Sequence, residues 1–266
     1  MVEPIAHLGL VDEADLELDK AALEIAALDH PGLGLGRYFD LLEQMTDRLR
    51  VRAEAARTPD AQVEALAEVL AQEFGFEGDR ETYDVPDNAD LIRVIDRRRG
   101  LPVALAILYV AQARRLGWAA HALNTPGHVL IGVGAPRALL ADPFNRGARV
   151  GREQFANLFL ASGVRDAAAA PERIAPMSSR AVLTRLLANQ ATRAEQAGQP
   201  DRALVVLQRI TTVAPGYSLG WWERARLELL LGDGAAARAS LSSMLETTRD
   251  AALRRHVTRI LEALGG

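Results

Sequence analysis

The sequence predicts an α+β core followed by an all-α helical repeat. Apolar residues recur at helical spacing through most of the first hundred residues and again after residue 180. Between these regions, one helical segment is apolar on every side, and short apolar segments separated by turns follow it. This order of elements predicts a helical N-terminal region with a small antiparallel sheet that packs on a buried helix.

Four helices are predicted before the buried one. Three of them stop at residues that terminate helices, namely Pro31–Gly32, Gly75 and Gly100. The predicted helices are Ala14–Leu28, Tyr38–Val51, about Ala61–Phe74, and Asp90–Arg99. The stretch between the third and fourth helices is rich in turn residues, so we expect a loop there.

The segment Leu101–Leu116 is predicted to be buried inside the core. Pro102 suits the first turn of a helix, where a missing N–H costs no hydrogen bond. The residues after this proline are apolar all round, and a helix without a polar side lies inside a domain. Arg114, Arg115 and Gly117 are typical of the C-terminal end of a helix.

Three strands of a small antiparallel sheet are predicted after this helix. They are the short apolar segments Ala119–Leu123, His128–Val133 and Ala138–Ala141. Turn sequences rich in proline and glycine, residues 124–127 and 134–137, separate them. The sheet would pack on the buried helix.

A period of 34 residues marks the C-terminal region as a helical repeat. The residue pairs at this spacing are Gly198 and Gly232, Ala203 and Ala237, and Leu207 and Leu241. The period and the small residues are typical of tetratricopeptide repeats, and Asp250–Leu264 would be the helix that caps the open end. The predicted domains are a core over residues 1–164, a linker over 165–179, and the repeats with their cap over 180–266.

The composition excludes several kinds of chemistry. The chain has no cysteine, which excludes disulfides, zinc–thiolate sites and thiol catalysis. Ser162 is the first serine and Lys20 the only lysine, so the core lacks a serine nucleophile and a P-loop lysine. A net charge of −4 gives no general attraction to nucleic acid or to a membrane. We expect a cytoplasmic protein without a cofactor or a metal ion.

Four motifs in a fixed order give the chain a resemblance to a known family. The motifs are Gly75–Asp79, Arg98–Pro102, Pro126–His128 and Asp142–Phe144. With the repeats behind them, they resemble the SirB-type proteins, whose naming implies a regulatory role in bacteria. The resemblance implies a transglutaminase-like, papain-like α+β core followed by tetratricopeptide repeats.

The same resemblance implies a degenerate catalytic triad. Active transglutaminase-like enzymes use a Cys-His-Asp triad, with the cysteine at the start of the buried helix. His128 and Asp142 match the last two positions of this triad. The nucleophile position falls near Pro102 or Val103, and neither residue is a nucleophile. Transamidation and thiol proteolysis are therefore excluded.

The favoured hypothesis is a non-catalytic regulatory or adaptor protein. The repeats would bind a protein or peptide partner on their concave surface, and the degenerate cleft is a second place for a peptide. Trp222, Arg224 and Arg226 are candidate anchors because tryptophan and arginine are enriched at binding hot spots. Trp221 is expected to pack between the repeat helices instead.

Several alternatives assign other roles to the same residues. In a hydrolase without a protein nucleophile, His128 held by Asp142 would act as a general base on water, whereas in a pseudoenzyme this pair is only a structural hydrogen bond. Thr125 is a weaker candidate nucleophile. His121, His128 and Asp142 together have the ligand types of a zinc site. The run Arg97–Arg99 would either hold an anion or pair with carboxylates.

Overall fold

A computed structural model describes residues 4–161 and 175–265 of the chain. The chain divides into two compact units. Glu13–Val182 forms the mixed unit, and Met1–Asp12 together with Leu183–Gly266 forms the helical unit. The predicted α+β region followed by paired helices is confirmed. The predicted limits of core, linker and repeats stay a prediction, and residues 165–174 of that linker lie outside the described residues.

The helices of the mixed unit start where local signals favour them. Thr58 accepts a hydrogen bond from the Ala61 backbone N–H at the start of α3, and Asp90 accepts one from the Arg93 N–H at the start of α4. The α-helices are α1 (Leu18–Ala27), α2 (Gly36–Ala53), α3 (Pro59–Leu66), α4 (Leu91–Arg97), α5 (Pro102–Arg115) and α6 (Arg152–Ala161). Shorter elements are the π-helix η2 (Ala67–Glu73) and the 3-10 helices η3 (Pro86–Ala89) and η4 (Pro143–Asn145).

Helix α5 is the centre of the mixed unit, as predicted. All of its residues from Pro102 to Ala113 are buried, so the helix is surrounded by protein. The C-terminal end of α5 contacts α1 through a bidentate ion pair, in which Arg115 donates to the two carboxylate oxygens of Asp19 at 2.6 and 2.7 Å. Asp19 is fully buried, and the two parallel hydrogen bonds satisfy its charge.

Helix α4 ends earlier than the sequence suggests. Arg98 adopts a left-handed conformation, with φ of 60°, and this stops the helix before Arg99. Arg99–Gly100 then forms strand β2, which pairs in parallel with strand β1, Glu77–Gly78. Gly100 does not end the helix: a Cβ atom there would lie 2.8 Å from Val94, so the glycine permits close packing of β2 on α4.

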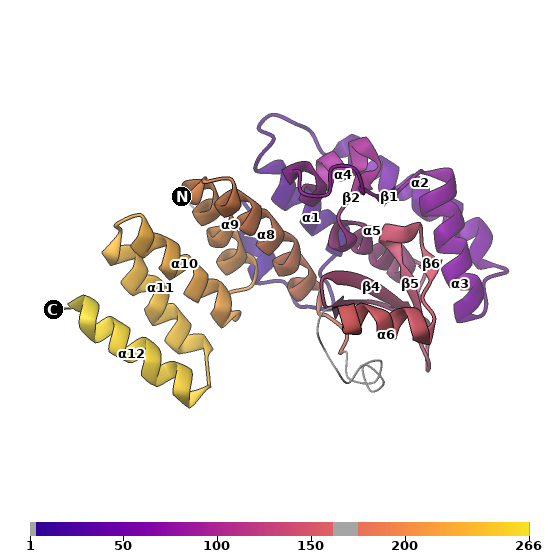
Figure 1. Cartoon of the computed structure of the whole chain (residues 1–266). Coiled ribbons are helices and arrows are strands. Elements are labelled where there is room, and N and C mark those ends of the chain that lie inside the picture. Colours follow the sequence, from indigo (N-terminus) through magenta and orange to yellow (C-terminus); the bar gives the residue numbers. More distant parts are fainter. Residues whose placement is uncertain (1–3, 162–174, 266) are drawn as a thin grey trace. The chain divides into compact units, whose positions relative to one another are not determined.

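The antiparallel sheet has the strand order β3-β4-β5-β6. The strands are β3 (Ala120–Thr125), β4 (His128–Val133), β5 (Leu139–Asp142) and β6 (Ala148–Arg149). The first three confirm the predicted strands, and β6 is an addition. Leu123 and Leu130 pack with Phe155 of α6, while the buried α5 lies on the other side of the sheet (Figure 1). The sheet is thus covered on both faces.

The helical unit consists of paired antiparallel helices. They are α8 (Ser179–Gln196, which crosses the boundary between units), α9 (Pro200–Val213), α10 (Ser218–Leu230), α11 (Gly234–Thr247) and α12 (Ala251–Gly265). The 3-10 helix η1 (Ala6–Gly9) packs on α9, where a Cβ on Gly9 would lie 2.3 Å from the Thr212 carbonyl oxygen. In the part of the chain that is described, no helix has the length and apolar character needed to cross a membrane.

Candidate functional site

The structure brings His128 and Asp142 together. His128 is the first residue of β4 and Asp142 the last of β5, and His128 Nε2 lies 2.9 Å from Asp142 Oδ1. The same carboxylate oxygen accepts hydrogen bonds from the Phe144 and Asn145 backbone N–H groups at the start of η4. Because Asp142 acts as an acceptor, we assign the proton to Nε2 of His128, which leaves Nδ1 as the ring atom able to accept a proton.

The position expected to hold the nucleophile is apolar and buried. Pro102 begins α5, and Val103 follows it with 2% of its surface exposed. Neither side chain carries a hydroxyl, thiol or amine. A histidine–aspartate pair without a nucleophile cannot form an acyl intermediate by the mechanism of a thiol enzyme.

Thr125 does not replace the missing nucleophile. It lies directly opposite His128 in the β3–β4 register, across a two-residue turn in which Gly127 has φ of +69°. Its hydroxyl is buried, and within the described residues it has no hydrogen-bond partner. An activated threonine needs a base that accepts its proton, and the hydroxyl makes no hydrogen bond to the His128 ring.

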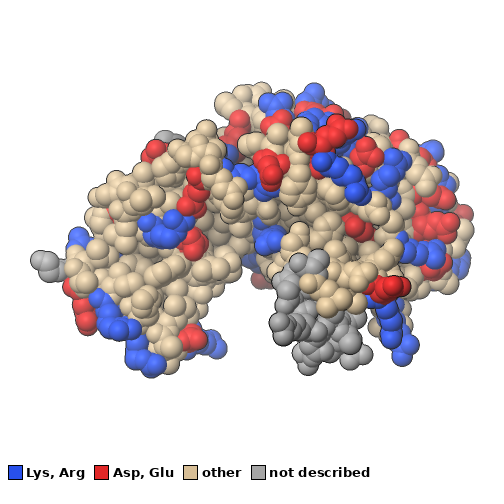
Figure 2. Space-filling view, in the orientation of Figure 1, with Lys and Arg blue, Asp and Glu red and all other residues tan. Residues whose placement is uncertain are grey.

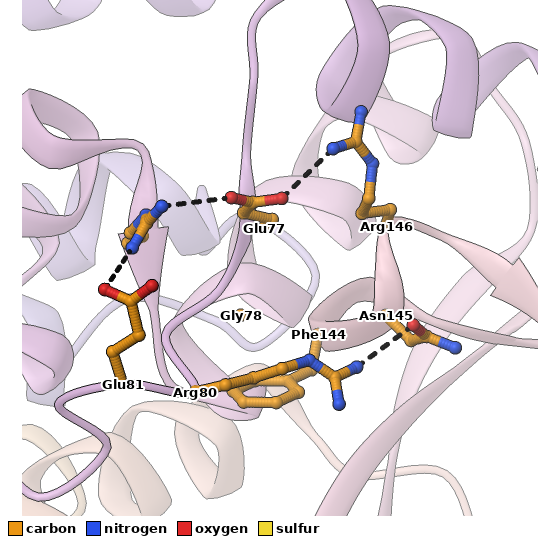
Figure 3. A pocket seen from close by; sticks show the side chains of 8 residues that line it. Glu77, Gly78, Arg80, Glu81, Phe144, Asn145 and Arg146 are labelled. Atoms are coloured by element: carbon orange, nitrogen blue, oxygen red, sulfur yellow. Dashed lines mark hydrogen bonds and ion pairs between the residues drawn. The ribbon is translucent and has the colours of Figure 1, made fainter.

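Phe144 links His128 to the segment that leads into α5. Its ring meets the His128 ring edge to face, with centroids 5.8 Å apart. The ring also lies on the backbone of Gly78, where a Cβ atom would be 2.4 Å from the ring carbons. Gly78 pairs with Gly100, two residues before α5 starts. Phe144 therefore packs between the β1–β2 pair and the histidine. Figure 3 shows Phe144 beside Gly78.

Substitution of Gly78 by alanine is expected to lower the free energy of unfolding by about 1–3 kcal/mol, the usual range for an overpacked core. The added methyl group would push the Phe144 ring away from its present place. Urea denaturation followed by circular dichroism measures the change. Gly36→Ala is the control, because nothing lies near its Cβ and the residue is helical; a loss as large in this variant would contradict the steric explanation.

A pocket of about 150 Å³ opens beside Phe144, on the side of β1. We call it the guanidinium pocket; it is lined by Glu77, Gly78, Arg80, Glu81, Arg99, Phe144, Asn145 and Arg146. Three of the lining residues are arginines, and Figure 3 shows Arg80 beside Asn145 and Arg146 beside Glu77. This pocket was not predicted from the sequence, although Asp142 followed by Pro143 is a cap signal that indicates a tight turn at this place.

Family comparison agrees with this geometry. Residues 37–188 match the model of the transglutaminase-like superfamily, described as Transglut_core2. The chain belongs to the transglutaminase-like superfamily. The matched region contains α5, the sheet, His128 and Asp142, so the predicted kinship of the core is confirmed.

Bacterial relatives match between half and nine-tenths of the chain. A UPF0162 protein of Xylella fastidiosa (strain 9a5c) is 30% identical over 243 residues, which cover 90% of this chain and 86% of the relative. A UPF0162 protein of Vibrio cholerae is 30% identical over 142 residues, covering 52% of this chain and 53% of the relative. A solved structure of menin gives a TM-score of 0.45 at 14% identity, over 91% of this chain and 68% of menin.

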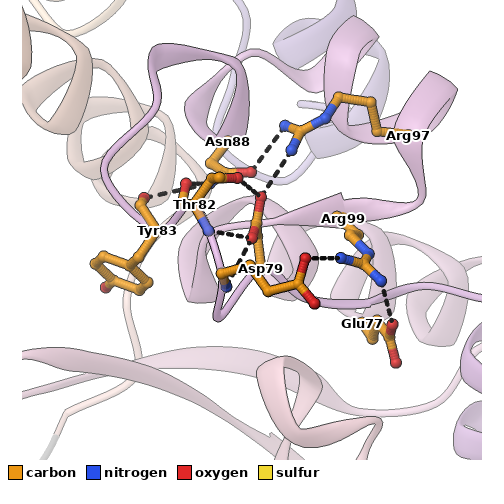
Figure 4. Close-up of polar contacts among 8 residues, drawn as sticks. Glu77, Asp79, Thr82, Tyr83, Asn88, Arg97 and Arg99 are labelled. Atoms are coloured by element: carbon orange, nitrogen blue, oxygen red, sulfur yellow. Dashed lines mark hydrogen bonds and ion pairs between the residues drawn. The ribbon is translucent and has the colours of Figure 1, made fainter.

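In this transglutaminase-like unit, Asp79 organises the loop that precedes α4 (Figure 4). Its carboxylate accepts hydrogen bonds from the Thr82 hydroxyl at 2.6 Å, the Thr82 N–H at 2.8 Å and the Arg97 guanidinium at 2.7 Å. Burial by itself would raise the pKa of Asp79, but these hydrogen bonds outweigh it and hold the pKa well below its usual range.

The arginine run before α5 pairs with carboxylates. Arg97 donates to Asp79, and Arg99 lies between Glu77 and Glu81, at 3.5 and 3.4 Å (Figure 4). Arg98 packs over the Phe76 ring, 4.7 Å from its centroid. Of the two roles considered for this run, the ion-pairing role describes Arg97 and Arg99 in this structure.

Two of the proposed anchors in the helical unit take part in internal ion pairs. Arg224 donates to Glu228 at 2.8 Å and to the Thr211 hydroxyl at 3.2 Å. Arg226 pairs with Glu195 at 2.7 Å and with Glu223 at 2.7 Å. Arg224 therefore has a structural role. The Arg226 side chain is more exposed than that of Arg224.

Trp222 lines an apolar groove, unlike the neighbouring Trp221. Trp221 is partly buried and donates its indole N–H to the Pro215 carbonyl at 2.8 Å. The Trp222 ring lies 5.6 Å from the His256 ring of α12. The groove has a volume of about 400 Å³ and is lined by Trp222, Ala225, Arg226, Leu229, Leu230, Leu241 and Ile260.

His121 does not join His128 and Asp142. It lies opposite Gly132, and its ring fills the space that a side chain there would need, since a Cβ on Gly132 would be 2.7 Å from His121 Nε2. Burial lowers the pKa of His121, and the charge of Arg114 lowers it further. Across residues 4–161 and 175–265, no group of three or more His, Cys, Asp or Glu side chains is placed to hold a metal ion.

Proposed function

We propose that this protein is a non-catalytic regulatory adaptor of the SirB type, which binds a segment of a partner protein in the apolar groove of tetratricopeptide-type repeats. The observation that carries the proposal is the groove itself. Leu230 has 67% of its surface exposed and Leu229 has 39%, beside the partly buried Trp222. Adjacent exposed apolar side chains of this kind mark binding surfaces.

The packing of the helices supports the repeat assignment. Ala203 and Ala237, which are 34 residues apart, are both fully buried on the second helices of consecutive pairs. Gly198 and Gly232 both have positive φ, 70° and 84°, in the turns between paired helices. Residues 34 positions apart thus have the same structural roles in α8–α9 and in α10–α11, as expected for a repeat.

The charges beside the groove favour an acidic occupant. Ile260 of α12 lines the groove, and exposed Arg255 and Arg259 lie on the same helix, with Arg259 one turn from His256. Basic side chains gather along the edge formed by α12, at the lower left of Figure 2. A partner segment with apolar anchors and flanking Asp or Glu residues fits both features.

The chemistry of the mixed unit supports a non-catalytic role. Pro102 and Val103, near which the nucleophile of the family is expected, carry no reactive group, and the Thr125 hydroxyl is not hydrogen-bonded to His128. The His128–Asp142 pair is only partly exposed, with 16% and 18% of the side-chain surfaces accessible. Its hydrogen bonds join the ends of β4 and β5 to η4, which is a structural role that requires no substrate.

Leu230→Glu is expected to abolish capture of the partner, because a carboxylate in the groove would be desolvated and would repel acidic residues of the partner. The full-length protein is used as bait in a lysate of its native host, and bound proteins are quantified by mass spectrometry. The partner's binding segment is then measured directly as a synthetic peptide by calorimetry.

Two control variants test whether any loss of binding is specific to the groove. Leu219→Glu changes another exposed leucine of α10 that does not line the groove, so it should bind as the wild type does. His128→Ala should also retain binding. Loss of binding in His128→Ala but not in Leu230→Glu would overturn the proposal and direct attention to the cleft as a working site.

A further inference from the structure

We propose that the guanidinium pocket of the mixed unit binds a carboxylate group of a peptide. This site is separate from the apolar groove and does not depend on the adaptor proposal. Arg80, Arg99 and Arg146 line a pocket of about 150 Å³, which suits a small planar group rather than a whole side chain with its backbone. Figure 3 shows Arg80 lying along the Phe144 ring and Arg146 directed at Glu77.

Arg80 is the member of the pocket that lacks a carboxylate partner. Arg99 and Arg146 share Glu77, and Arg99 also reaches Glu81. Arg80 donates instead to the neutral Asn145 side-chain oxygen at 3.1 Å, and among the described residues no Asp or Glu pairs with it. Its charge is therefore available to an external anion.

The charge balance of the pocket selects a carboxylate over a phosphate. The three arginines carry three positive charges, and Glu77 and Glu81 carry two negative ones, so the pocket has a formal charge of +1. A monovalent carboxylate neutralises this charge, whereas a phosphate dianion would leave an excess negative charge close to two carboxylates.

Phe144 holds Arg80 in a geometry suited to bidentate binding. The Arg80 guanidinium carbon lies 5.5 Å from the centroid of the Phe144 ring, as in a cation–π contact. A guanidinium that stacks on an aromatic ring keeps the N–H groups at its edge free for hydrogen bonds in the plane. The absence of a side chain at Gly78 leaves room for the ring on which Arg80 rests.

The backbone of Arg146 is consistent with a ligand site. Arg146 has φ of 56°, a conformation that non-glycine residues seldom adopt and that costs on the order of 1 kcal/mol. This turn directs Asn145 and Arg146 to the same pocket, where Asn145 contacts Arg80 and Arg146 contacts Glu77. A carboxylate in the pocket would gain charge-assisted hydrogen bonds from Arg80, while Arg146 keeps its donors on Glu77 and on the Ala71 carbonyl oxygen.

The contact between Phe144 and His128 gives a direct readout of binding. Because the two rings touch, a ligand that orders Arg80 on Phe144 should shift the ring-proton signals of His128. The chain has only five histidines, so these signals can be resolved by NMR and assigned with His128→Ala. N-acetylglycine supplies a chain-end carboxylate, and the amide of N-acetylglutamic acid supplies a side-chain carboxylate.

We expect both carboxylates to shift the His128 signals of the full-length protein, and the tighter one identifies the source as a chain end or a side chain. N-acetylglycinamide, which lacks the charge, should cause no shift. Arg80→Gln should weaken binding at least about tenfold, since it removes charge-assisted hydrogen bonds. Arg80→Lys should give an intermediate affinity, because it keeps the charge and loses the planar donor group.

Arg93→Gln, an exposed arginine of α4 outside the pocket, is the matched control and should bind as the wild type does. Three results would overturn the proposal: equal shifts with the uncharged amide, unchanged affinity in Arg80→Gln, or tighter binding of inorganic phosphate than of either carboxylate. None of these measurements involves the groove of the helical unit. They therefore test the carboxylate site independently of the adaptor function.

Discussion

Replacing Arg224 with alanine is expected to lower the free energy of unfolding of the helical unit by about 3 kcal/mol. Glu228 has only 2% of its side-chain surface exposed, and its charge is satisfied by Arg224 at 2.8 Å and by the Ser240 hydroxyl at 2.6 Å. Without Arg224, the carboxylate would stay buried with one neutral donor. The cluster joins α9, α10 and α11, because Arg224 also donates to Thr211.

Arg226→Ala is the matched control for this prediction. Arg226 lies two residues further along α10, and its partners Glu195 and Glu223 are partly solvent-exposed, with 31% and 37% of their side-chain surfaces accessible. Exposed ion pairs contribute only about 0–1 kcal/mol, so this variant should unfold nearly as the wild type does. Equal losses in the two variants, measured by urea denaturation, would show that burial of Glu228 does not decide the effect.

Arg224 and Arg226 illustrate a limit of sequence-based site prediction. Both arginines follow two tryptophans, and residue type and clustering make Trp222, Arg224 and Arg226 candidates for a binding surface. The structure separates them by burial: Arg224 belongs to an internal cluster, while Trp222 and Arg226 line a groove. Which helix face meets a neighbouring helix depends on the crossing of three helices, and spacing along one helix does not specify this.

The elements that were predicted well have strong local signals. Helix α5 is apolar on all sides, and β4 lies between two proline–glycine turns, so both follow from the residues within each segment. The two-residue strands β1, β2 and β6 have no periodicity of their own. Strands β1 and β2 exist because distant segments pair, as Glu77 does with Arg99, and β6 forms by pairing with β5 across the η4 turn. None of these pairings is visible in a local pattern.

The candidate sites also divide into one that was predicted from the sequence and one that depends on the packing of separate segments. His128 and Asp142 were identified by resemblance to a family motif, and the structure places them 2.9 Å apart. The guanidinium pocket draws residues from three segments, 77–81, 99 and 144–146. These segments overlap three of the motifs found in the sequence, but nothing in the motifs shows that they enclose a pocket. The segments meet because β1 pairs with β2 and because Phe144 packs on Gly78. A site assembled by packing in this way becomes visible only in three dimensions.

Asp79→Asn is expected to lower the free energy of unfolding by about 3 kcal/mol at neutral pH. Asp79 has 1% of its surface exposed and holds Thr82 and Arg97 through its two carboxylate oxygens. The amide group of asparagine would point a donor at the Arg97 guanidinium, which is itself a donor. The loop between β1 and α4 would lose its buried anion.

The size of this loss should depend on pH in a defined direction. Folding lowers the pKa of Asp79, so the folded state favours the ionised carboxylate. The stabilisation is therefore fully present above the unfolded pKa of about 3.9, and it is lost as the pH falls below that value towards the lower pKa of the folded state. The difference between wild type and Asp79→Asn should be constant from neutral pH to about pH 5 and should shrink below about pH 4.

Asp87→Asn provides the control, because Asp87 is exposed in the same loop. Its effect should stay within about 0.5 kcal/mol at every pH. Denaturation curves collected across the acid range for the three proteins test both statements. If the stability difference between wild type and Asp79→Asn did not shrink in acid, the negative charge of Asp79 would not be the source of the stabilisation. The shape of the side chain alone would then account for it. A difference that shrinks as described would identify the buried anion as the group that fixes Arg97 and, through the arginine run, the approach to α5.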